Sequence, residues 1–194
     1  MEFNVLISGT GGQGSVLASK LIAVAAQKKG FSARTTETIG MAQRGGCVTG
    51  HLRLTKDLEI TASPILARKS ADMILAMELA ETVRVLPFLK DGGIVISCNN
   101  AVFPITGGYD KDEMMKFLKT TAPNALIADS SEFIAKNSAN AKALNVFVLS
   151  FAAANGKFPF DLNDLQAAIC ETIPEKFLEL NLTAFNAGKD VHYG

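Results

Sequence analysis

Short apolar runs alternate with amphipathic stretches along the first two thirds of the chain. Residues 4–8 (NVLIS) are mostly apolar and end at a cluster of glycines, which predicts a buried first strand. From Gly14 onward apolar residues recur at helical spacing, and Gly30 marks the end of this predicted helix. Further strands are predicted at 32–38, 47–54, 72–77, 94–97 and 125–129.

Helical patterns separate these strands and then fill the end of the chain. They lie at 79–89 and 110–120, after a capping Ser130 or Ser131, and at 143–154, 162–173 and 175–187. Strands that alternate with helices predict a three-layer α/β/α fold with a mainly parallel, Rossmann-like sheet. We expect one domain over residues 1–194, with a helical carboxyl-terminal segment at about 142–190.

The strand predicted at 47–54 differs from the others. Its residues alternate between apolar and polar, which indicates that one face is exposed and that Thr49, His51 and Arg53 lie on it. No helical crossover precedes it, which leaves open a mixed sheet. Asp91-Gly92-Gly93 predicts a turn into the strand at 94–97.

Composition and charge exclude several classes of protein. The 194 residues are 48% hydrophobic, so the chain is not disordered, and 19 basic residues balance 19 acidic ones. This balance gives no electrostatic signature for nucleic acid or for an anionic membrane. No apolar run approaches the roughly 18 residues that span a bilayer, and Met1-Glu2-Phe3-Asn4 does not begin a signal peptide. We therefore expect a cytoplasmic protein.

The cysteines and histidines predict no metal site on this chain. Cys47, Cys98 and Cys170 are too far apart in sequence for a disulfide framework or for the ligand spacing of zinc and iron–sulfur sites. His51 and His192 are the only histidines.

A glycine-rich loop lies between the first strand and the first helix. It fits the pattern G-x-G-x-x-G and supplies the candidate cofactor-binding residues Gly9, Gly11, Gly12, Gln13 and Gly14. Glycine lets the backbone approach an anion, and the following helix offers unpaired N–H groups. Glu37 follows at about the distance of the acid that binds ribose in Rossmann proteins. The alternative is that the glycines only permit close packing of strand and helix.

A second glycine motif carries a resemblance to a known family. It reads Gly40-Met41-Ala42-Gln43-Arg44-Gly45-Gly46-Cys47-Val48 and leads into the strand that contains His51. Together with the first motif, this block resembles the gamma-type subunits of 2-oxoacid:ferredoxin oxidoreductases, most closely the indolepyruvate branch. The closing stretch Asn181-Leu182-Thr183-Ala184-Phe185-Asn186-Ala187-Gly188 is similar to the last helix of that family.

The resemblance implies a part in anaerobic metabolism, as a subunit that is not an enzyme by itself. The family decarboxylates 2-oxoacids on thiamine diphosphate with magnesium, passes electrons through iron–sulfur clusters to ferredoxin and forms an acyl-CoA from coenzyme A. This chain lacks the Gly-Asp-Gly and Asn-Asn pair of a thiamine diphosphate site, since Asp91-Gly92-Gly93 and Asn99-Asn100 have the wrong form and spacing. The resemblance therefore implies that these cofactors lie on a larger catalytic partner, and that the glycine loop faces a phosphate such as that of coenzyme A or supports the interface.

Substrate or interface residues are expected in the second motif. Arg44 is the strongest candidate, because a guanidinium flanked by glycines can pair with a carboxylate or phosphate, or clamp its own loop. Gly45 and Gly46 leave it unobstructed, and Met41 and His51 are expected at an interface. No catalytic residue is assigned, and Cys47 is expected to be a packing residue.

Two other functions remain open at this stage. An NAD(P)-dependent dehydrogenase would account for the glycine loop and Glu37 but leaves Arg44-Gly45-Gly46 unexplained. A nucleotide-binding assembly module without enzymatic activity would use the same loop.

Overall fold

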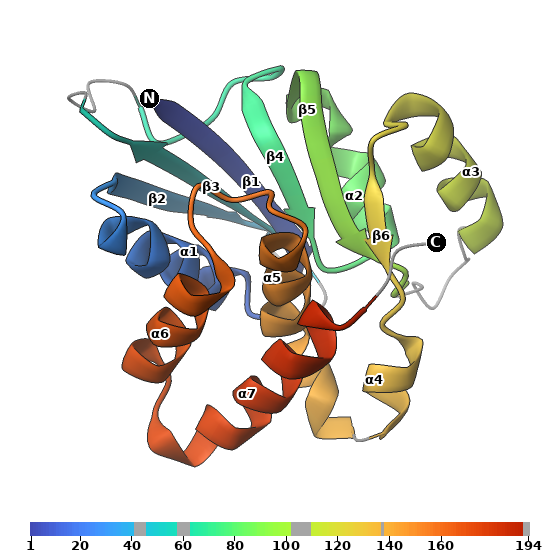
Figure 1. Cartoon of the computed structure of the whole chain (residues 1–194). Coiled ribbons are helices and arrows are strands. Elements are labelled where there is room, and N and C mark those ends of the chain that lie inside the picture. The colour runs from blue at the N-terminus through green and yellow to red at the C-terminus, as the bar shows by residue number, and fades with distance from the viewer. Residues whose placement is uncertain (41–45, 58–62, 102–109, 137, 192–194) are drawn as a thin grey trace.

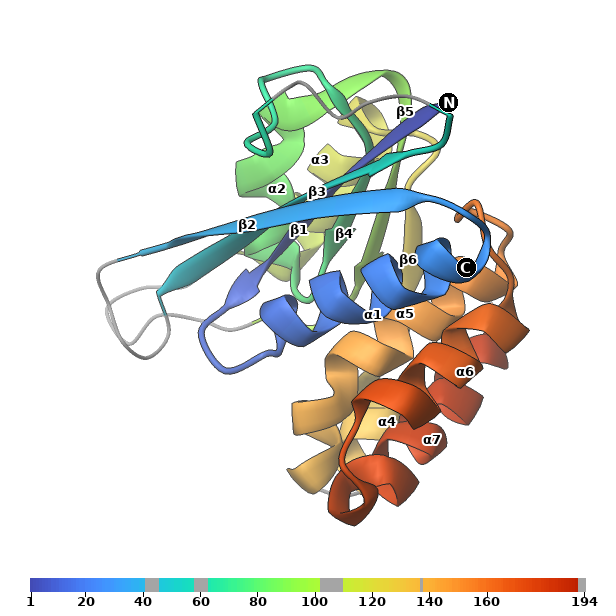
Figure 2. The same ribbon diagram turned by 90° about the vertical axis from the view of Figure 1, so that its left-hand side faces the viewer.

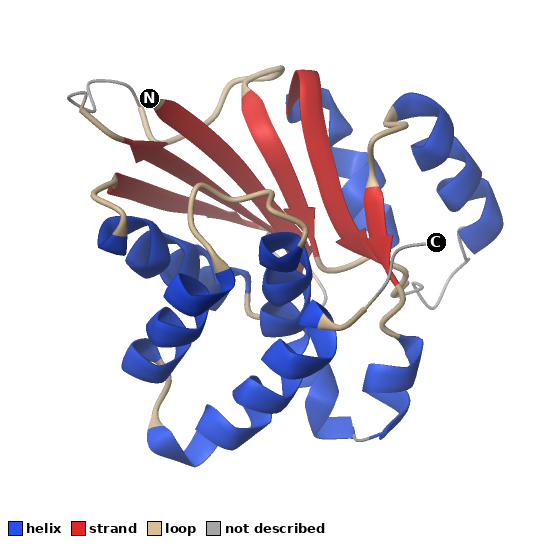
Figure 3. Cartoon of the chain, in the orientation of Figure 1, coloured by secondary structure: helices blue, strands red, loops and turns tan. Residues whose placement is uncertain are grey.

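The computed structural model describes residues 1–40, 46–57, 63–101, 110–136 and 138–191. Its centre is a six-stranded sheet with helices on both faces (Figures 1 and 3). The strands lie in the order β2-β3-β1-β4-β5-β6. Their bounds are β1 Glu2–Thr10, β2 Ser32–Ile39, β3 Cys47–Thr55, β4 Ala71–Ala76, β5 Leu89–Cys98 and β6 Leu126–Ala128.

Only β3 runs against the other strands. It pairs antiparallel with both β1 and β2, whereas β1, β4, β5 and β6 pair in parallel. The predicted α/β/α fold with a mainly parallel and mixed sheet is thus confirmed. The missing crossover before residue 47 was the correct signal, because a strand that follows its neighbour without a crossover must return antiparallel.

The helices divide between the two faces of the sheet (Figure 2). α1 packs on β1, β2 and β3, and α5 on β4 and β5, while α6 and α7 pack on these two helices. α2 covers β1, β4 and β5 on the opposite face and contacts α3. The bounds are α1 Ser15–Lys28, α2 Leu79–Val85, η1 Leu86–Phe88, α3 Lys111–Thr121, α4 Ser131–Lys136, η2 Ser138–Ala143, α5 Leu144–Ala154, α6 Leu162–Thr172 and α7 Glu175–Lys189.

The larger core lies between the sheet and α1, α5, α6 and α7. α5 is buried along nearly its whole length, as the uninterrupted apolar run of its sequence predicts. Gly188 lets α7 lie directly against α5, because a Cβ at this position would be 2.1 Å from the carbonyl oxygen of Phe147. The glycine of the closing motif therefore has a packing role.

Two local predictions are wrong. Asp91-Gly92-Gly93 does not form a turn before a strand; β5 begins at Leu89 and continues through these residues, with Gly92 at φ 77° and a register shift against β4. The exposed face predicted for β3 is covered, since Thr49 and His51 are 7% and 3% exposed. Leu66, from the connection between β3 and β4, and Arg84 of α2 lie over them.

A candidate anion site at the carboxyl edge of the sheet

Five of the six strands end at the same edge of the sheet, and β3 begins there. The chain leaves β1 through α1 on one face and leaves β4 through α2 on the other. Such a reversal between neighbouring parallel strands is where open α/β sheets form their ligand crevice. The glycine loop after β1 and residues 77–78 after β4 lie at this point.

The glycine loop has the backbone geometry that its sequence predicts. Gly12 and Gly14 have φ angles of 96° and 81°, in the region that favours glycine. Gln13 folds back so that its Oε1 accepts a hydrogen bond from the N–H of Thr10 at 2.8 Å. Gln13 thus closes the loop with one end of its amide.

Asn145 anchors the loop from α5. Its Nδ2 donates to the carbonyl oxygen of Gly14 at 3.1 Å, and a Cβ on Gly14 would lie 2.6 Å from that nitrogen. Gly14 therefore serves close packing in addition to its backbone conformation. Sequence reasoning missed Asn145, although it is the one amide in the apolar run 143–154.

The amino terminus of α1 offers unpaired polar groups. Gly14 caps this helix with no side-chain hydrogen bond. Among the described residues, the buried Oγ of Ser15 and Oδ1 of Asn145 have no partner. Because the first N–H groups of a helix also carry partial positive charge, this end can accept an anion such as a phosphate.

The two glycine motifs meet at this edge. The N–H of Gly11 donates to the carbonyl oxygen of Gly46 at 2.8 Å, and the N–H of Gly40 donates to that of Cys47 at 2.9 Å. Candidates Met41, Arg44 and Gly45 lie outside the described residues. The structure thus brings Gly46 to the predicted anion loop.

Glu37 does not occupy the place of a Rossmann ribose-binding acid. It lies on β2 opposite Gly50 of β3, and β3 separates β2 from β1. Neighbouring strands lie about 4.8 Å apart, so the strand that carries Glu37 is roughly 10 Å from β1 instead of beside it. The dinucleotide geometry is therefore not reproduced.

Charged and hydroxyl groups form a network near this edge, on the face of the sheet that α2 covers. Glu78, 2% exposed, begins α2 and accepts hydrogen bonds from the N–H groups of Ala80 and Glu81. The Glu81 carboxylate accepts from Ser8 Oγ at 2.8 Å and from Arg84. These bonds fix the start of α2 to β1.

Arg84 completes the network and was missed by the sequence analysis. Its Nε lies 3.0 and 2.9 Å from the two carboxylate oxygens of Glu81, and its Nη2 donates to Thr49 Oγ1 at 2.9 Å. The hydrogen bond to Glu81 raises the pKa of Arg84, against the effect of burial. The side chain keeps 42% of its surface exposed. A fixed, half-exposed guanidinium is a suitable group for binding a carboxylate or phosphate.

Comparison with known proteins decides the family. The family model described as pyruvate ferredoxin/flavodoxin oxidoreductase matches residues 4–191. The chain belongs to this family. It is 34% identical to the indolepyruvate oxidoreductase subunit IorB of Archaeoglobus fulgidus, over 97% of this chain and 94% of the relative.

Solved structures show the same fold. The pyruvate oxidoreductase subunit PORC of Thermotoga maritima superimposes with a TM-score of 0.69 at 17% identity, over 98% of this chain and 96% of that one. The 2-oxoglutarate:ferredoxin oxidoreductase of Magnetococcus marinus matches with a TM-score of 0.70 at 19% identity. That match covers 97% of this chain but 30% of the other, so this fold also occurs as a part of a longer oxidoreductase chain.

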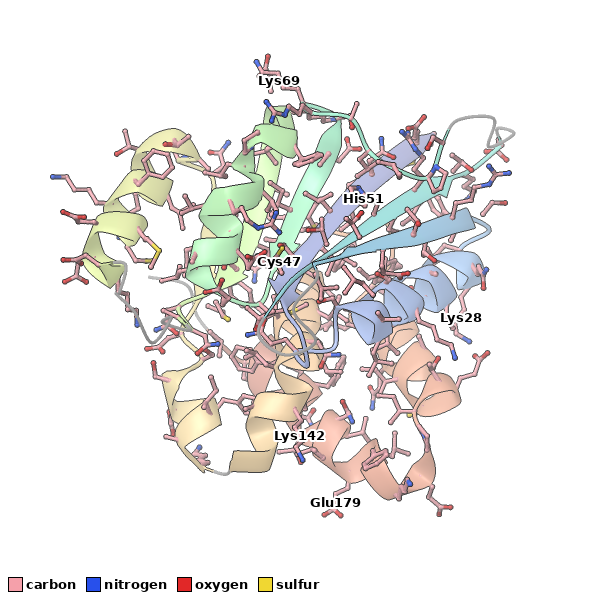
Figure 4. All side chains as sticks on the ribbon, turned by 180° about the vertical axis from the view of Figure 1, so that it is seen from behind. Lys28, Cys47, His51, Lys69, Lys142 and Glu179 are labelled. Carbon is pink, nitrogen blue, oxygen red and sulfur yellow. The ribbon has the colours of Figure 1, made fainter. Side chains whose placement is uncertain are left out.

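His51, which the sequence analysis expected at an interface, is buried in the chain. Its Nδ1 accepts the N–H of Leu66 at 3.2 Å, and its ring meets that of Phe88 edge-on. Burial lowers the pKa of His51 below its ordinary value of 6.5. Figure 4 shows it farther from the carboxyl edge than Cys47. In this position His51 supports the sheet and does not contact the edge.

The described residues do not fit the metal cofactors used by the family's chemistry. Cys47 lies on β3, Cys98 is buried on β5 and Cys170 is exposed on α6. Burial raises the pKa of the Cys98 thiol to about 11, which disfavours the thiolate that binds metals. No three His, Cys, Asp or Glu side chains gather as metal ligands in the part of the chain that the structure describes.

Asp91 and Asn99 do not form a magnesium–pyrophosphate site. They lie toward opposite ends of β5, which separates them by roughly 25 Å at about 3.3 Å per residue. Asn99 instead bonds Asp129 and the N–H of Ser130, and the N–H and hydroxyl of Ser131 lower the pKa of Asp129. Asn99 and Asp129 thus fix the loop after β6.

No helix within the described ranges is long and apolar enough to cross a membrane.

Proposed function

We propose that this chain is the small subunit of a cytoplasmic 2-oxoacid:ferredoxin oxidoreductase that acts on an aryl pyruvate such as indolepyruvate. The match to an indolepyruvate oxidoreductase subunit along nearly the whole length of both proteins carries this proposal. A larger partner subunit would hold thiamine diphosphate, magnesium and the iron–sulfur clusters and would reduce ferredoxin. The scattered cysteines of this chain support that division of labour.

The glycine loop is the proposed contact for a phosphate of coenzyme A. The unpaired hydroxyl of Ser15 and the amino terminus of α1, which no side chain caps, support an anion there. The Magnetococcus structure was solved with coenzyme A bound, which makes this ligand a reasonable choice for the co-substrate. Arg44, Gly45 and Met41, which lie outside the described residues, are proposed to contact the ligand or the partner.

Reconstitution tests this function. The purified small subunit should show no turnover with indolepyruvate, coenzyme A, thiamine diphosphate, magnesium and a dye acceptor. Addition of the large subunit should give dye reduction, with kcat/KM higher for indolepyruvate than for pyruvate or 2-oxoglutarate. Turnover by the small subunit alone would refute the subunit role, and a preference for pyruvate would refute the aryl substrate.

A further inference from the structure

Three apolar side chains lie beside the glycine loop, on the face of the sheet that α1 covers. They are Val16 at the start of α1, Val48 of β3 and Ile39 at the end of β2. Figure 2 shows α1 beginning at the end of the sheet where β2 ends and β3 begins. Val16 and Ile39 are 54% and 67% exposed, and Val48 is half-buried. We call these three residues the apolar strip.

The packing of α1 on β3 places the three side chains next to one another. Ser19 of α1 meets β3 at Gly50, where its Oγ would lie 2.9 Å from an added Cβ. One turn before Ser19, on the same side of the helix, lies Val16. Two residues before Gly50, on the same face of β3, lies Val48. Ile39 is directly opposite Val48 in the antiparallel pair and projects from the same face.

The apolar strip continues into the glycine loop. Val48 lies opposite Gly9 of β1, and Val16 directly follows Ser15 at the start of α1. A Cβ added to Gly12 would have no atom within 4 Å, so the space beside the loop is open at this point. A ligand can therefore rest apolar atoms on the strip while its anionic group contacts the loop.

The loop offers many donors to one anion. The hydroxyl of Ser15, a residue that is 4% exposed, has no partner among the described residues. A terminal phosphate monoester has a charge of about −1.5 to −2 and three acceptor oxygens, more than a phosphate within a diphosphate bridge has. So many donors at a helix terminus therefore suit a terminal phosphate best. The N–H groups that donate to no described residue are those of Gly12, Gly14, Ser15, Val16 and Leu17.

Glu37 fixes the direction in which a ligand can lie. It precedes Ile39 by two residues on the same face of β2, so it stands at the end of the apolar strip away from the carboxyl edge. Its carboxylate repels a phosphate at that end and can accept a hydrogen bond from an amino group. The phosphate of a ligand is thus directed to the glycine loop, and an apolar ring with an amino group to the strip.

We propose that this site holds the adenosine 3′-phosphate end of coenzyme A, with the terminal phosphate in the glycine loop and the adenine ring on the apolar strip. The proposal rests on the proposed function for the choice of ligand. In coenzyme A the terminal phosphate and the adenine are attached to the same ribose, so the adjoining loop and strip can hold both. The thiol at the other end of coenzyme A must reach thiamine diphosphate on the partner, which leaves the nucleotide end for this chain.

Calorimetry on the purified chain tests the position of the terminal phosphate. Coenzyme A should bind with a Kd at least about tenfold lower than that of 3′-dephospho-coenzyme A, which keeps the adenine and the bridging diphosphate. Ser15→Ala should raise Kd for coenzyme A about threefold to tenfold and leave Kd for the dephospho form unchanged. Thr55→Val removes another buried hydroxyl without a described partner, at the far end of β3, and should change neither Kd.

A second pair of variants tests the apolar strip. Ile39→Ser should raise Kd for coenzyme A and for its dephospho form alike, by about fivefold, because both carry the adenine ring. Ile65→Ser is the matched control, since Ile65 is 56% exposed and lies in the connection between β3 and β4. It should change neither Kd. Both isoleucines are exposed, so both variants should keep the wild-type melting temperature.

The outcomes separate this site from the proposed function. Equal Kd values for coenzyme A and its dephospho form, or no binding of coenzyme A, would overturn the site even if the enzyme reconstituted with the large subunit is active. The expected binding pattern in a chain that gives no turnover with the large subunit would support the site and refute the proposed function. If Ile39→Ser weakens only the binding of the large subunit, the strip is a subunit contact and the proposal is wrong.

Discussion

At the scale of single residues, Gly14 and Asn145 share one small volume between α1 and α5. Gly14 combines a φ of 81° with a carbonyl group that Asn145 binds, and the Asn145 side chain is fully buried. Both residues are therefore sensitive to added atoms. The same contact fixes the glycine loop to the helix most deeply buried in the core.

Gly14→Ala should lower the free energy of unfolding by about 2–3 kcal/mol, from backbone strain together with overpacking against Asn145. Gly12→Ala is the matched control: Gly12 also has a positive φ, but no atom lies within 4 Å of an added Cβ. It should lose only about 1 kcal/mol. Urea denaturation measures both, and equal losses would show that the Asn145 contact is unimportant. In an Asn145→Ala background the difference between the two variants should shrink.

His51 should make the stability of the chain depend on pH. In the unfolded chain it titrates near 6.5, whereas burial lowers its pKa in the folded protein. Between these two values the unfolded state binds more protons, so stability falls as pH falls through this window, by at most about 1.4 kcal/mol per pH unit. His51→Asn, which keeps an acceptor for the N–H of Leu66, should reduce this slope in urea denaturation.

The residues whose roles were hardest to predict are those that contact residues far away in the sequence. The backbone demands of Gly12 and Gly14 follow from local chemistry, and the structure shows both positive φ angles. Arg84 and Asn145 gain their importance from Thr49 and Gly14, which are far away in sequence. His51 was placed on an exposed face because nothing local shows that Leu66 returns to cover it.

At the scale of elements, α2 is held to the sheet by polar contacts as well as by apolar packing. Ser8 of β1 and Thr49 of β3 both bond to the Glu81–Arg84 pair on this two-turn helix. A helix this short has little stability of its own. Its position therefore depends on these bonds.

Glu81→Ala should lower the free energy of unfolding by about 2 kcal/mol. Removal of one member of a fully buried ion pair costs about 3–5 kcal/mol, and the lower value reflects the access of Arg84 to water. Glu132→Ala breaks the exposed pair with Lys136 on α4 and should cost less than about 0.5 kcal/mol. Similar losses for the two variants, measured by urea denaturation, would contradict a structural role for the network.

Most elements could be predicted from sequence because their periodicity and end signals agree. The predicted helices at 162–173 and 175–187 correspond to α6 at Leu162–Thr172 and α7 at Glu175–Lys189. The start of β5 could not be predicted, because Asp91-Gly92-Gly93 has turn composition and only pairing with Ala71 of β4 extends the strand to Leu89. Long-range pairing overrode local turn preference.

At the scale of the whole molecule, the position of β3 argues against a dehydrogenase. The loop after β1 resembles a dinucleotide fingerprint, but the strand that carries Glu37 is not the neighbour of β1. NADH should therefore bind with a Kd above about 1 mM, and Glu37→Ala should leave any residual heat of binding unchanged. Calorimetry that found micromolar affinity, lost on this substitution, would support the dehydrogenase.

The inserted β3 also has a consequence for synthesis of the protein. β1, α1 and β2 leave the ribosome before β3, and a strand–helix–strand unit readily pairs its two strands in parallel with a right-handed crossover. In the finished sheet that place beside β1 belongs to β3. A nascent chain that pairs β1 with β2 must open again before β3 can enter, so the amino-terminal third carries a built-in competition between an early and a final partner.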